Sequence, residues 1–306
     1  MFLVSGASGN VGGELVRALA GAGLPVRALT RSGAAPGFPP GVAVAAGDLN
    51  DPDSLAGPLA GVSGVFLLAG YADMPGLLAR AADAGVQHVV LLSSGAVAGG
   101  DVANAVVRYN VVSEAAVHDS GLAGTILRPS GFHSNALRWL PQLLAGNVIR
   151  EPFADVPVAS IDPLDIAAVA ALALTQTAGQ AAGSASGQTA GQTAGQTVGQ
   201  AAGQTVTYRL TGPAPVLPAV KAQILGKVLG RDLVLEPLSD ADARAEMSAS
   251  TPQPYVDAFF SFFADGTYDD ARVDPTAERL LGRPPRTFEQ WAQAHADDFA
   301  PSPPPA

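Results

Sequence analysis

Residues 1–15 read MFLVSGASGNVGGEL, and this stretch predicts how the rest of the chain is organised. A short apolar run is followed by Gly6, Gly9 and Gly12, spaced three apart, and then by apolar residues at helical spacing. That order predicts a strand, a tight turn and a helix packed on a sheet. A dinucleotide pyrophosphate needs such glycines, because they allow a tight turn and a close approach to the backbone. The N-terminus of the helix would then face the anion.

A glycine pattern alone is a weak indicator in a chain with 35 glycines. Here the pattern follows a predicted strand and opens a predicted helix, which is the context expected for a dinucleotide-binding turn. The sequence therefore predicts cofactor binding by the turn and the start of the helix, through Gly6, Ala7, Ser8, Gly9, Asn10, Val11 and Gly12.

Composition limits the classes of function. The chain has 306 residues, of which 48% are hydrophobic, and this is enough for a large core. Its net charge of −10 argues against direct binding of nucleic acid. Cysteine is absent and the four histidines lack the spacing of metal ligands, so we predict no metal site. The sequence shows neither a signal peptide nor an apolar run near the ~20 residues of a membrane span. We therefore expect a cytoplasmic protein that acts on a small molecule.

Apolar runs alternate with helical patterns along the chain, which indicates an α/β protein with a parallel sheet. We predict a doubly wound sheet of the Rossmann type in residues 1–150, completed by segments within 151–212, and a smaller C-terminal α/β lobe in 213–300. The expected strands are 2–5, 25–30, 41–47, 64–70, 86–92, 124–129, 156–161, 206–211 and 233–237. The expected helices are 11–19, 77–84, 104–120, 136–145, one that starts at 163, 217–229, 240–249, 254–264, 274–281 and 288–299.

Two segments are expected to lie outside the packed core. Residues 178–205 repeat Ala-Gly-Gln-Thr units with glycine at every fourth position. Each glycine disfavours a helix by roughly 1 kcal/mol, and no apolar face is present, so the sequence predicts a flexible surface insert. Residues 301–306 form a proline-rich tail that is expected to be disordered.

The end of the second predicted strand indicates which cofactor is bound. An acidic residue there would bind the ribose 2′-hydroxyl of NAD, whereas an arginine accommodates the 2′-phosphate of NADP. Arg31 follows this strand, and no Asp or Glu lies between Glu14 and Asp48. Arg31 therefore favours NADP(H) over NAD(H), although a solvated surface arginine is the alternative.

Several motifs along the chain carry a resemblance to a known family. They are the glycine turn, the sequence GDL at 47–49, TILRP at 125–129 followed by Phe132 and Asn135, DIA at 165–167 and YRLTGP at 208–213. With these motifs the chain resembles the NmrA-like atypical short-chain dehydrogenase/reductases, over nearly its whole length apart from the repeat. That group includes NAD(P)H:quinone and azo-dye reductases and also non-catalytic redox-sensing regulators.

The resemblance and the fold together imply further cofactor contacts. In the family, Asp48 and Leu49 lie near the adenine, although Asp48 could instead cap the next helix. Ligands bind at the carboxyl ends of the strands in such sheets, where the small residues after the fourth strand would let the nicotinamide half pass. These expected contacts are Leu68, Ala69 and Gly70 after the fourth strand, Ser93 after the fifth, and Pro129 and Phe132 after the sixth.

The predicted catalytic residues are Tyr109 and His133. The acid catalyst of the wider superfamily is a tyrosine followed four residues later by a lysine, which lowers the tyrosine pKa from the same helix face. Here Ser113 takes the lysine position, and an unassisted tyrosine has a pKa near 10. A packed helix aromatic is the alternative for Tyr109. His133 is the second proton donor considered, and Asn110 is expected to contact the nicotinamide ribose.

The sequence leaves two main functions open. The first is an NADPH-dependent reductase that passes hydride to a flat acceptor such as a quinone, a reaction in which the cofactor carries the chemistry. The second is a non-catalytic NADP(H)-sensing regulator. A third, an isomerase that uses a bound cofactor, is weakened by the missing lysine. The oligomeric state, monomer or homodimer, stays open.

Overall fold

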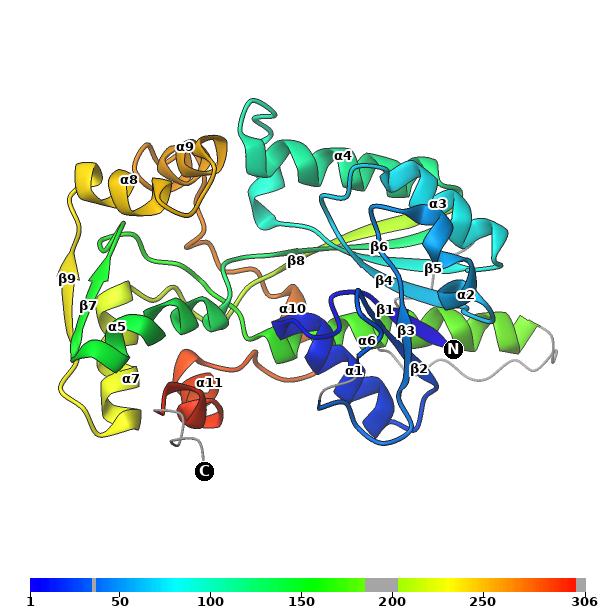
Figure 1. Ribbon diagram of the computed structural model, residues 1–306, viewed down its shortest axis with the longest axis horizontal. Coiled ribbons are helices and arrows are strands. Elements are labelled where there is room, and N and C mark those ends of the chain that lie inside the picture. The colour runs from blue at the N-terminus through cyan, green and yellow to red at the C-terminus, as the bar shows by residue number, and fades with distance from the viewer. Residues whose placement is uncertain (35–36, 185–202, 301–306) are drawn as a thin grey trace.

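A seven-stranded parallel sheet forms the centre of the larger part of the molecule (Figure 1). The computed structural model describes residues 1–34, 37–184 and 203–300, with the backbone alone for 176–184. The strand order is β3-β2-β1-β4-β5-β6-β8, which confirms the doubly wound Rossmann-type topology. These strands are β1 (Phe2–Val4), β2 (Val26–Thr30), β3 (Ala43–Ala46), β4 (Gly64–Leu68), β5 (His88–Leu92), β6 (Ala123–Pro129) and β8 (Thr205–Leu210).

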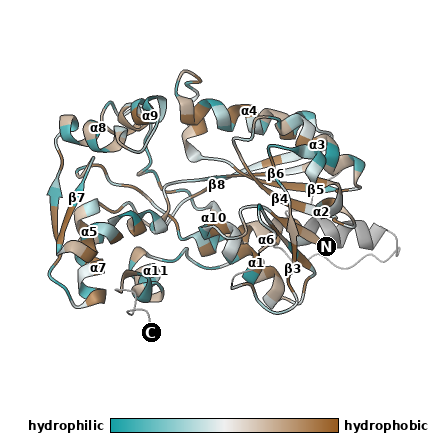
Figure 2. Ribbon diagram, viewed as in Figure 1, coloured by the Kyte–Doolittle hydropathy of each residue, from teal (hydrophilic) through white to brown (hydrophobic). Residues whose placement is uncertain are grey.

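Helices cover both faces of this sheet (Figure 1). Phe66 and Leu67 are consecutive in β4 and belong to separate buried clusters, so both faces of the strand are covered. This explains the uninterrupted apolar runs of the strands, which Figure 2 shows in brown. One face holds α1 (Asn10–Gly21), α6 (Pro163–Ser184) and α10 (Thr276–Leu281); the other holds α2 (Ala56–Leu59), α3 (Met74–Asp83) and α4 (Ala105–Asp119).

The smaller lobe has its own core around Trp139, Ile149 and Trp291. Its residues come from segments before and after α6 in the sequence. The strand β7, before α6, pairs in parallel with β9, which follows α6. Residues 133–150 thus pack in this lobe, although they lie inside the range 1–150 expected for the first domain. The lobe contains α5 (Leu140–Ala145), β7 (Val148–Glu151), α7 (Pro218–Leu229), β9 (Val234–Pro237), α8 (Asp240–Ser248), α9 (Gln253–Phe263) and α11 (Phe288–Ala294).

The expected strand at 156–161 is wrong. The segment makes only isolated bridges, from Val158 to Val216 and from Ile161 to Phe132. Its backbone hydrogen bonds go to different parts of the chain, and Pro157 has no N–H to donate to a ladder. Residues 148–151 form the strand instead.

Two expected helices are split. Where one helix was expected over 136–145, a 3-10 helix, His133–Trp139, leads into α5, whose first turn holds Pro141. The expected helix at 288–299 is α11 followed by a 3-10 turn, Ala296–Phe299. Two other 3-10 helices, Pro52–Leu55 and Gly95–Gly99, precede α2 and α4.

The repeat is partly helical, which corrects the expectation that its glycines exclude a helix. Helix α6 continues to Ser184 and so includes the first residues of the repeat. A helix already formed upstream adds further residues at low cost, because only the first turn pays for nucleation. The predicted flexible insert covered residues 178–205; of these, 185–202 lie outside the described residues, as does the tail 301–306, and Thr205 begins β8.

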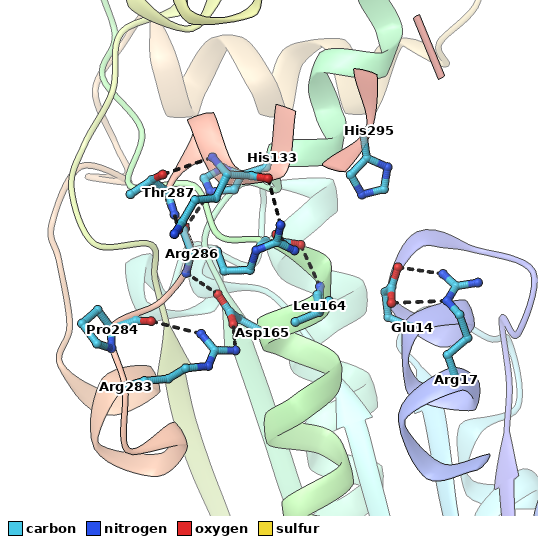
Figure 3. A network of polar contacts seen from close by, with 12 residues as sticks. Glu14, Arg17, His133, Leu164, Asp165, Arg283, Pro284, Arg286, Thr287 and His295 are labelled. Carbon is cyan, nitrogen blue, oxygen red and sulfur yellow. Dashed lines mark hydrogen bonds and ion pairs between the residues drawn. The ribbon is translucent and has the colours of Figure 1, made fainter. Parts of the chain in front are cut away.

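Asp162 and Asp165 fix the start of α6 and join it to the segment before α11. The Asp162 carboxylate accepts the N–H of Leu164 at 2.9 Å, as expected of a helix cap. Asp165 is fully buried and accepts hydrogen bonds from the Arg283 guanidinium and the Arg286 N–H, both at 2.6 Å (Figure 3). Within the described part of the chain, no helix has the length and apolar character to span a membrane.

Candidate cofactor and acceptor site

The glycine turn between β1 and α1 has the shape that a pyrophosphate requires. Gly6 has a φ of +57°, in the left-handed region that favours glycine. A Cβ on Gly12 would collide with the Gly6 carbonyl oxygen, so only glycine lets helix and strand approach this closely. A Cβ on Gly9 would meet just that oxygen, at 3.2 Å, and would otherwise project into the space that a phosphate would occupy.

The start of α1 is free to receive an anion. Gly9 is its N-cap, no side chain caps the helix, and its first turn contains no acidic residue. Its first N–H groups and positive dipole end therefore fit the pyrophosphate of NAD(P)H. Of the residues predicted to bind, Ser8, Gly9 and Asn10 are exposed, whereas the side chains of Ala7 and Val11 are buried, which leaves only their backbone for the predicted contact. The Asn10 amide donates to the Ser134 hydroxyl at 3.0 Å, which ties the turn to the loop after β6.

Three side chains surround the place where the adenosine ribose is expected. Arg31 and Asp48 are exposed after β2 and β3, and both act electrostatically on Tyr71. Burial raises the pKa of Tyr71, Asp48 raises it further and Arg31 lowers it. The Asp48 carboxylate accepts the N–H of Asn50 at 2.9 Å, and Leu49 is buried in the core.

The end of β4 contacts both the glycine turn and α4. Leu68 packs over Gly6, and Gly70 has a φ of +101° with the Tyr109 ring against it. Ser113, at the position where the superfamily has lysine, accepts the Gly70 N–H at 3.0 Å and donates to the Tyr109 carbonyl oxygen at 2.8 Å. Ser113 therefore holds the backbone after β4 in place of supporting an acid.

A buried ion pair anchors α4 to the ends of β5 and β6. Glu114 accepts two hydrogen bonds from the Arg128 guanidinium, at 2.9 and 2.5 Å. The Ser93 hydroxyl donates to the same carboxylate at 2.5 Å. The hydroxyl proposed to contact the cofactor is thus held by the protein, while Ser93 still lines the cavity described below.

The two candidate proton donors have different surroundings. Tyr109 is partly exposed and lines the cavity, and burial raises its pKa, so its hydroxyl stays protonated near neutrality. Asn110 is buried, and its amide donates to the Val106 carbonyl of its own helix at 2.9 Å. Tyr109 can therefore donate a hydrogen bond without readily losing its proton.

His133 is held as a neutral imidazole. Its side chain is buried, and burial lowers its pKa to about 4. Nε2 lies 3.2 Å from the Arg286 carbonyl oxygen (Figure 3) and must donate to it, so Nδ1 accepts from the Ser160 hydroxyl at 2.9 Å. A neutral ring with both nitrogens engaged lacks the extra proton of a general acid at neutral pH.

A cavity of about 710 Å³ lies between the sheet and the smaller lobe. Ser93, Pro129 and Phe132, at the ends of β5 and β6, form the wall where the nicotinamide is expected. Aromatic side chains from α9 face it, and its accessible surface is mostly apolar, as in sites that bind flat organic molecules. The lining from α9 includes Phe259, Phe262 and Phe263.

Sequence reasoning missed five titratable residues of this cavity. They come from separate segments, and no spacing in the sequence connects them. Tyr268 and Asp270 form a pair, in which the hydroxyl donates to the carboxylate at 2.8 Å and Gly131 N–H donates to its other oxygen at 3.0 Å. Burial raises the pKa of both side chains. The five are Arg138, Glu151, Lys221, Tyr268 and Asp270.

The chain is similar to known proteins over most of its length. Residues 6–177 match the model of a family described as NAD(P)H-binding. The chain belongs to this family. It is 38% identical to the (4-alkanoyl-5-oxo-2,5-dihydrofuran-3-yl)methyl phosphate reductase of Streptomyces griseus, over 98% of this chain and 100% of that one. It is 33% identical to an NAD(P)H azoreductase of Xenophilus azovorans, over 98% of this chain and 99% of the relative.

The fold is shared with solved structures as well. An NADPH-dependent quinone oxidoreductase of Escherichia coli, solved with NADPH, superimposes with a TM-score of 0.68 at 22% identity, covering 97% of this chain and 100% of the other. These comparisons confirm the predicted fold and the predicted class, an NAD(P)H-binding oxidoreductase. The resemblance to NmrA-like proteins holds for the fold, since a mutant NmrA structure superimposes with a TM-score of 0.66 at 17% identity, covering 95% of this chain and 94% of the other.

Proposed function

We propose that this chain is a reductase that takes hydride from NADPH, in preference to NADH, and passes it to a flat, electron-poor acceptor of the quinone type. The observation that carries the proposal is the cavity with mostly apolar walls, which is lined by the ends of β5 and β6. The two relatives, by name, reduce an azo compound and a phosphorylated dihydrofuranone, and both names support reduction of a small organic molecule.

Different residues of this chain would bind different parts of NADPH. The turn at Gly6, Gly9 and Gly12 and the uncapped start of α1 would hold the pyrophosphate. Arg31 has no hydrogen bond or ion pair within the described residues and is free to bind the 2′-phosphate of NADPH. The remaining predicted contacts, Asp48, Leu49, Leu68, Ala69, Gly70, Ser93, Asn110, Pro129 and Phe132, would line the path of the cofactor.

The acceptor side needs little acid–base help from the protein. Bound NADPH supplies the hydride, and the protein contributes binding, orientation and exclusion of water. Tyr109 would donate a hydrogen bond to an acceptor oxygen, since its raised pKa keeps the hydroxyl protonated. The missing lysine beside Tyr109 is therefore compatible with reduction of a quinone, whose oxygens can take protons from water.

The test is oxidation of NADPH by the whole chain with a panel of quinones and azo dyes, with NADH compared in parallel. We expect steady turnover, faster with NADPH. The Gly9→Asp variant should lose turnover, because it puts a carboxylate where the phosphates would lie. Tight NADPH binding without turnover would overturn the reductase proposal and favour the NADP(H)-sensing regulator.

A further inference from the structure

Two cationic side chains reach into the acceptor cavity. Arg138 precedes α5 and Lys221 lies in the first turn of α7, and both line the cavity. The Arg138 side chain is 56% exposed and Lys221 is partly exposed, yet burial lowers the pKa of both. Both side chains therefore present accessible surface to the cavity.

Arg138 is held in place by a buried carboxylate. Glu151 is almost fully buried and forms an ion pair with one guanidinium nitrogen of Arg138. The other Glu151 oxygen accepts the Trp139 indole N–H at 2.7 Å. Glu151 therefore fixes the arginine, and the remaining N–H donors of the guanidinium are left for a ligand.

Lys221 has no such partner. Within the described residues it forms no ion pair, and its ammonium lies 5.8 Å from the centre of the Phe288 ring. Asp270 acts on it electrostatically, but Tyr268 and the Gly131 N–H already engage both Asp270 oxygens. The position is also unfavourable for a cation, because it lies near the positive end of a helix and close enough to Arg138 for repulsion.

A cation without a partner, placed near a second cation and near the positive end of a helix, is unfavourable for the folded chain. Such locally unfavourable residues are typical of binding sites. We propose that the acceptor carries an oxyanion, a phosphate ester or a carboxylate, which Lys221 and Arg138 bind at the wall of the cavity formed by the smaller lobe. This inference rests on the proposed reductase function and adds the charge of its substrate.

The chemistry of the two side chains matches such a group. A guanidinium presents paired N–H donors that suit the oxygens of a phosphate or carboxylate, and an ammonium adds a point charge. The start of α7, where Pro218 lines the same cavity, adds the positive end of a helix. An anion bound there would relieve the repulsion between Lys221 and Arg138.

The experiment compares two acceptors that differ only in charge. One is a quinone with a short side chain that ends in a phosphate ester, and the other is the same quinone with the free alcohol. We expect the wild-type chain to prefer the phosphate ester in kcat/KM. Lys221→Met should lower kcat/KM for the ester by roughly 10- to 100-fold and leave the alcohol nearly unchanged. Lys221→Arg should restore most of the preference.

The control variant is Lys227→Met, which removes a charge from the exposed last turn of the same helix. It should leave the preference intact. Arg138→Met is a poorer variant, because it would leave the buried Glu151 carboxylate unpaired. A carboxylate in place of the phosphate in the same acceptor shows which oxyanion binds better.

Two outcomes separate this inference from the proposed function. If both acceptors turn over equally well in the wild-type chain and in Lys221→Met, the reductase stands and the oxyanion site is overturned. If neither acceptor is reduced, the reductase proposal fails, and calorimetric titration with the phosphate ester decides on the site. If the phosphate ester binds the wild-type chain but not Lys221→Met, the oxyanion site is supported. If the ester binds both chains equally, or binds neither, the site is overturned.

Discussion

At the scale of single residues, the three glycines of the turn have different physical roles. Gly12 has no room for a Cβ, because the Gly6 carbonyl oxygen occupies the space, whereas a Cβ on Gly9 makes one tight contact and otherwise points outward. Gly21, at the end of α1, has open space around it. The spacing in the sequence predicted the turn, but only the packing assigns a separate role to each glycine.

These roles predict different effects of the same change. Gly12→Ala should lower the free energy of unfolding by about 1–3 kcal/mol, through overpacking, and should abolish NADPH binding. Gly9→Ala should stay close to wild-type stability but bind NADPH more weakly. Gly21→Ala should stabilise the chain by up to about 1 kcal/mol. Urea unfolding and fluorescence titration with NADPH measure both quantities. If Gly9→Ala and Gly12→Ala lose equal stability, the assignment is wrong.

Arg31 gives a second prediction at this scale. Arg31→Ser removes the one cation that follows β2 and should raise KM for NADPH by roughly 10- to 100-fold with little effect on KM for NADH. The ratio of kcat/KM for the two cofactors measures this. Lys227→Ser, a loss of the same charge on the smaller lobe, is the control. An unchanged ratio in Arg31→Ser would mean that this arginine is a solvated surface residue.

The residues of the cofactor side could be predicted from the sequence because one local stretch contains most of them. The acceptor side could not, since Arg138, Lys221 and Asp270 are brought together only by the packing of the smaller lobe on the sheet. His133 was chosen for its chemistry, but its burial against the Arg286 carbonyl depends on a segment more than 150 residues away. Tertiary contacts of this kind leave no periodicity in the sequence.

At the scale of elements, the sequence predicts well the strands and helices that have strong apolar periodicity. The errors occur in segments whose secondary structure depends on contacts with distant residues. Residues 156–161 have the apolar alternation of a strand but send their hydrogen bonds to different segments. The strand β7 carries two charged residues, the exposed Arg150 and the buried Glu151, and it forms because β9 lies beside it. Neither outcome follows from local propensity.

The start of α6 carries a prediction about how the two lobes are joined. Asp165→Asn removes the charge that accepts from Arg283 and from the Arg286 N–H, and should lower the free energy of unfolding by about 1–3 kcal/mol, since the carboxylate is fully buried. Asp53→Asn is the matched control, because its ion pair with Arg80 is exposed and should contribute less than about 1 kcal/mol. Urea unfolding compares the two, and equal losses would contradict a structural role for Asp165.

At the scale of the whole molecule, the interior holds two histidines that resist protonation. His88 in β5 and His133 beside the smaller lobe are both buried, and burial lowers the pKa of each to about 4. In the unfolded chain a histidine has a pKa near 6.5, so the unfolded state takes up protons first as the pH falls. The stability that these side chains contribute is complete above about pH 6.5 and is lost as the pH falls toward 4.

Two buried carboxylates act in the opposite sense. Burial raises the pKa of Asp162 and of Asp270, so the folded state takes up their protons before the unfolded state does, and acid favours folding at these two positions. The carboxylate effect begins above the unfolded pKa near 4 and opposes that of the histidines, which acts between about pH 6.5 and 4. In that range we expect the free energy of unfolding to fall by up to about 1.4 kcal/mol per pH unit for each histidine.

The test is urea unfolding between pH 7 and 5 for the wild-type chain and for His88→Gln. The glutamine can keep a hydrogen bond to the Thr125 hydroxyl, which His88 contacts at 3.0 Å, but it does not titrate. Its slope of unfolding free energy against pH should be smaller than that of the wild type, by up to about 1.4 kcal/mol per pH unit, since one of two buried histidines is removed. His118→Gln, in the exposed last turn of α4, should leave the slope unchanged. If His118→Gln reduces the slope as much as His88→Gln does, burial is not the cause of the acid sensitivity.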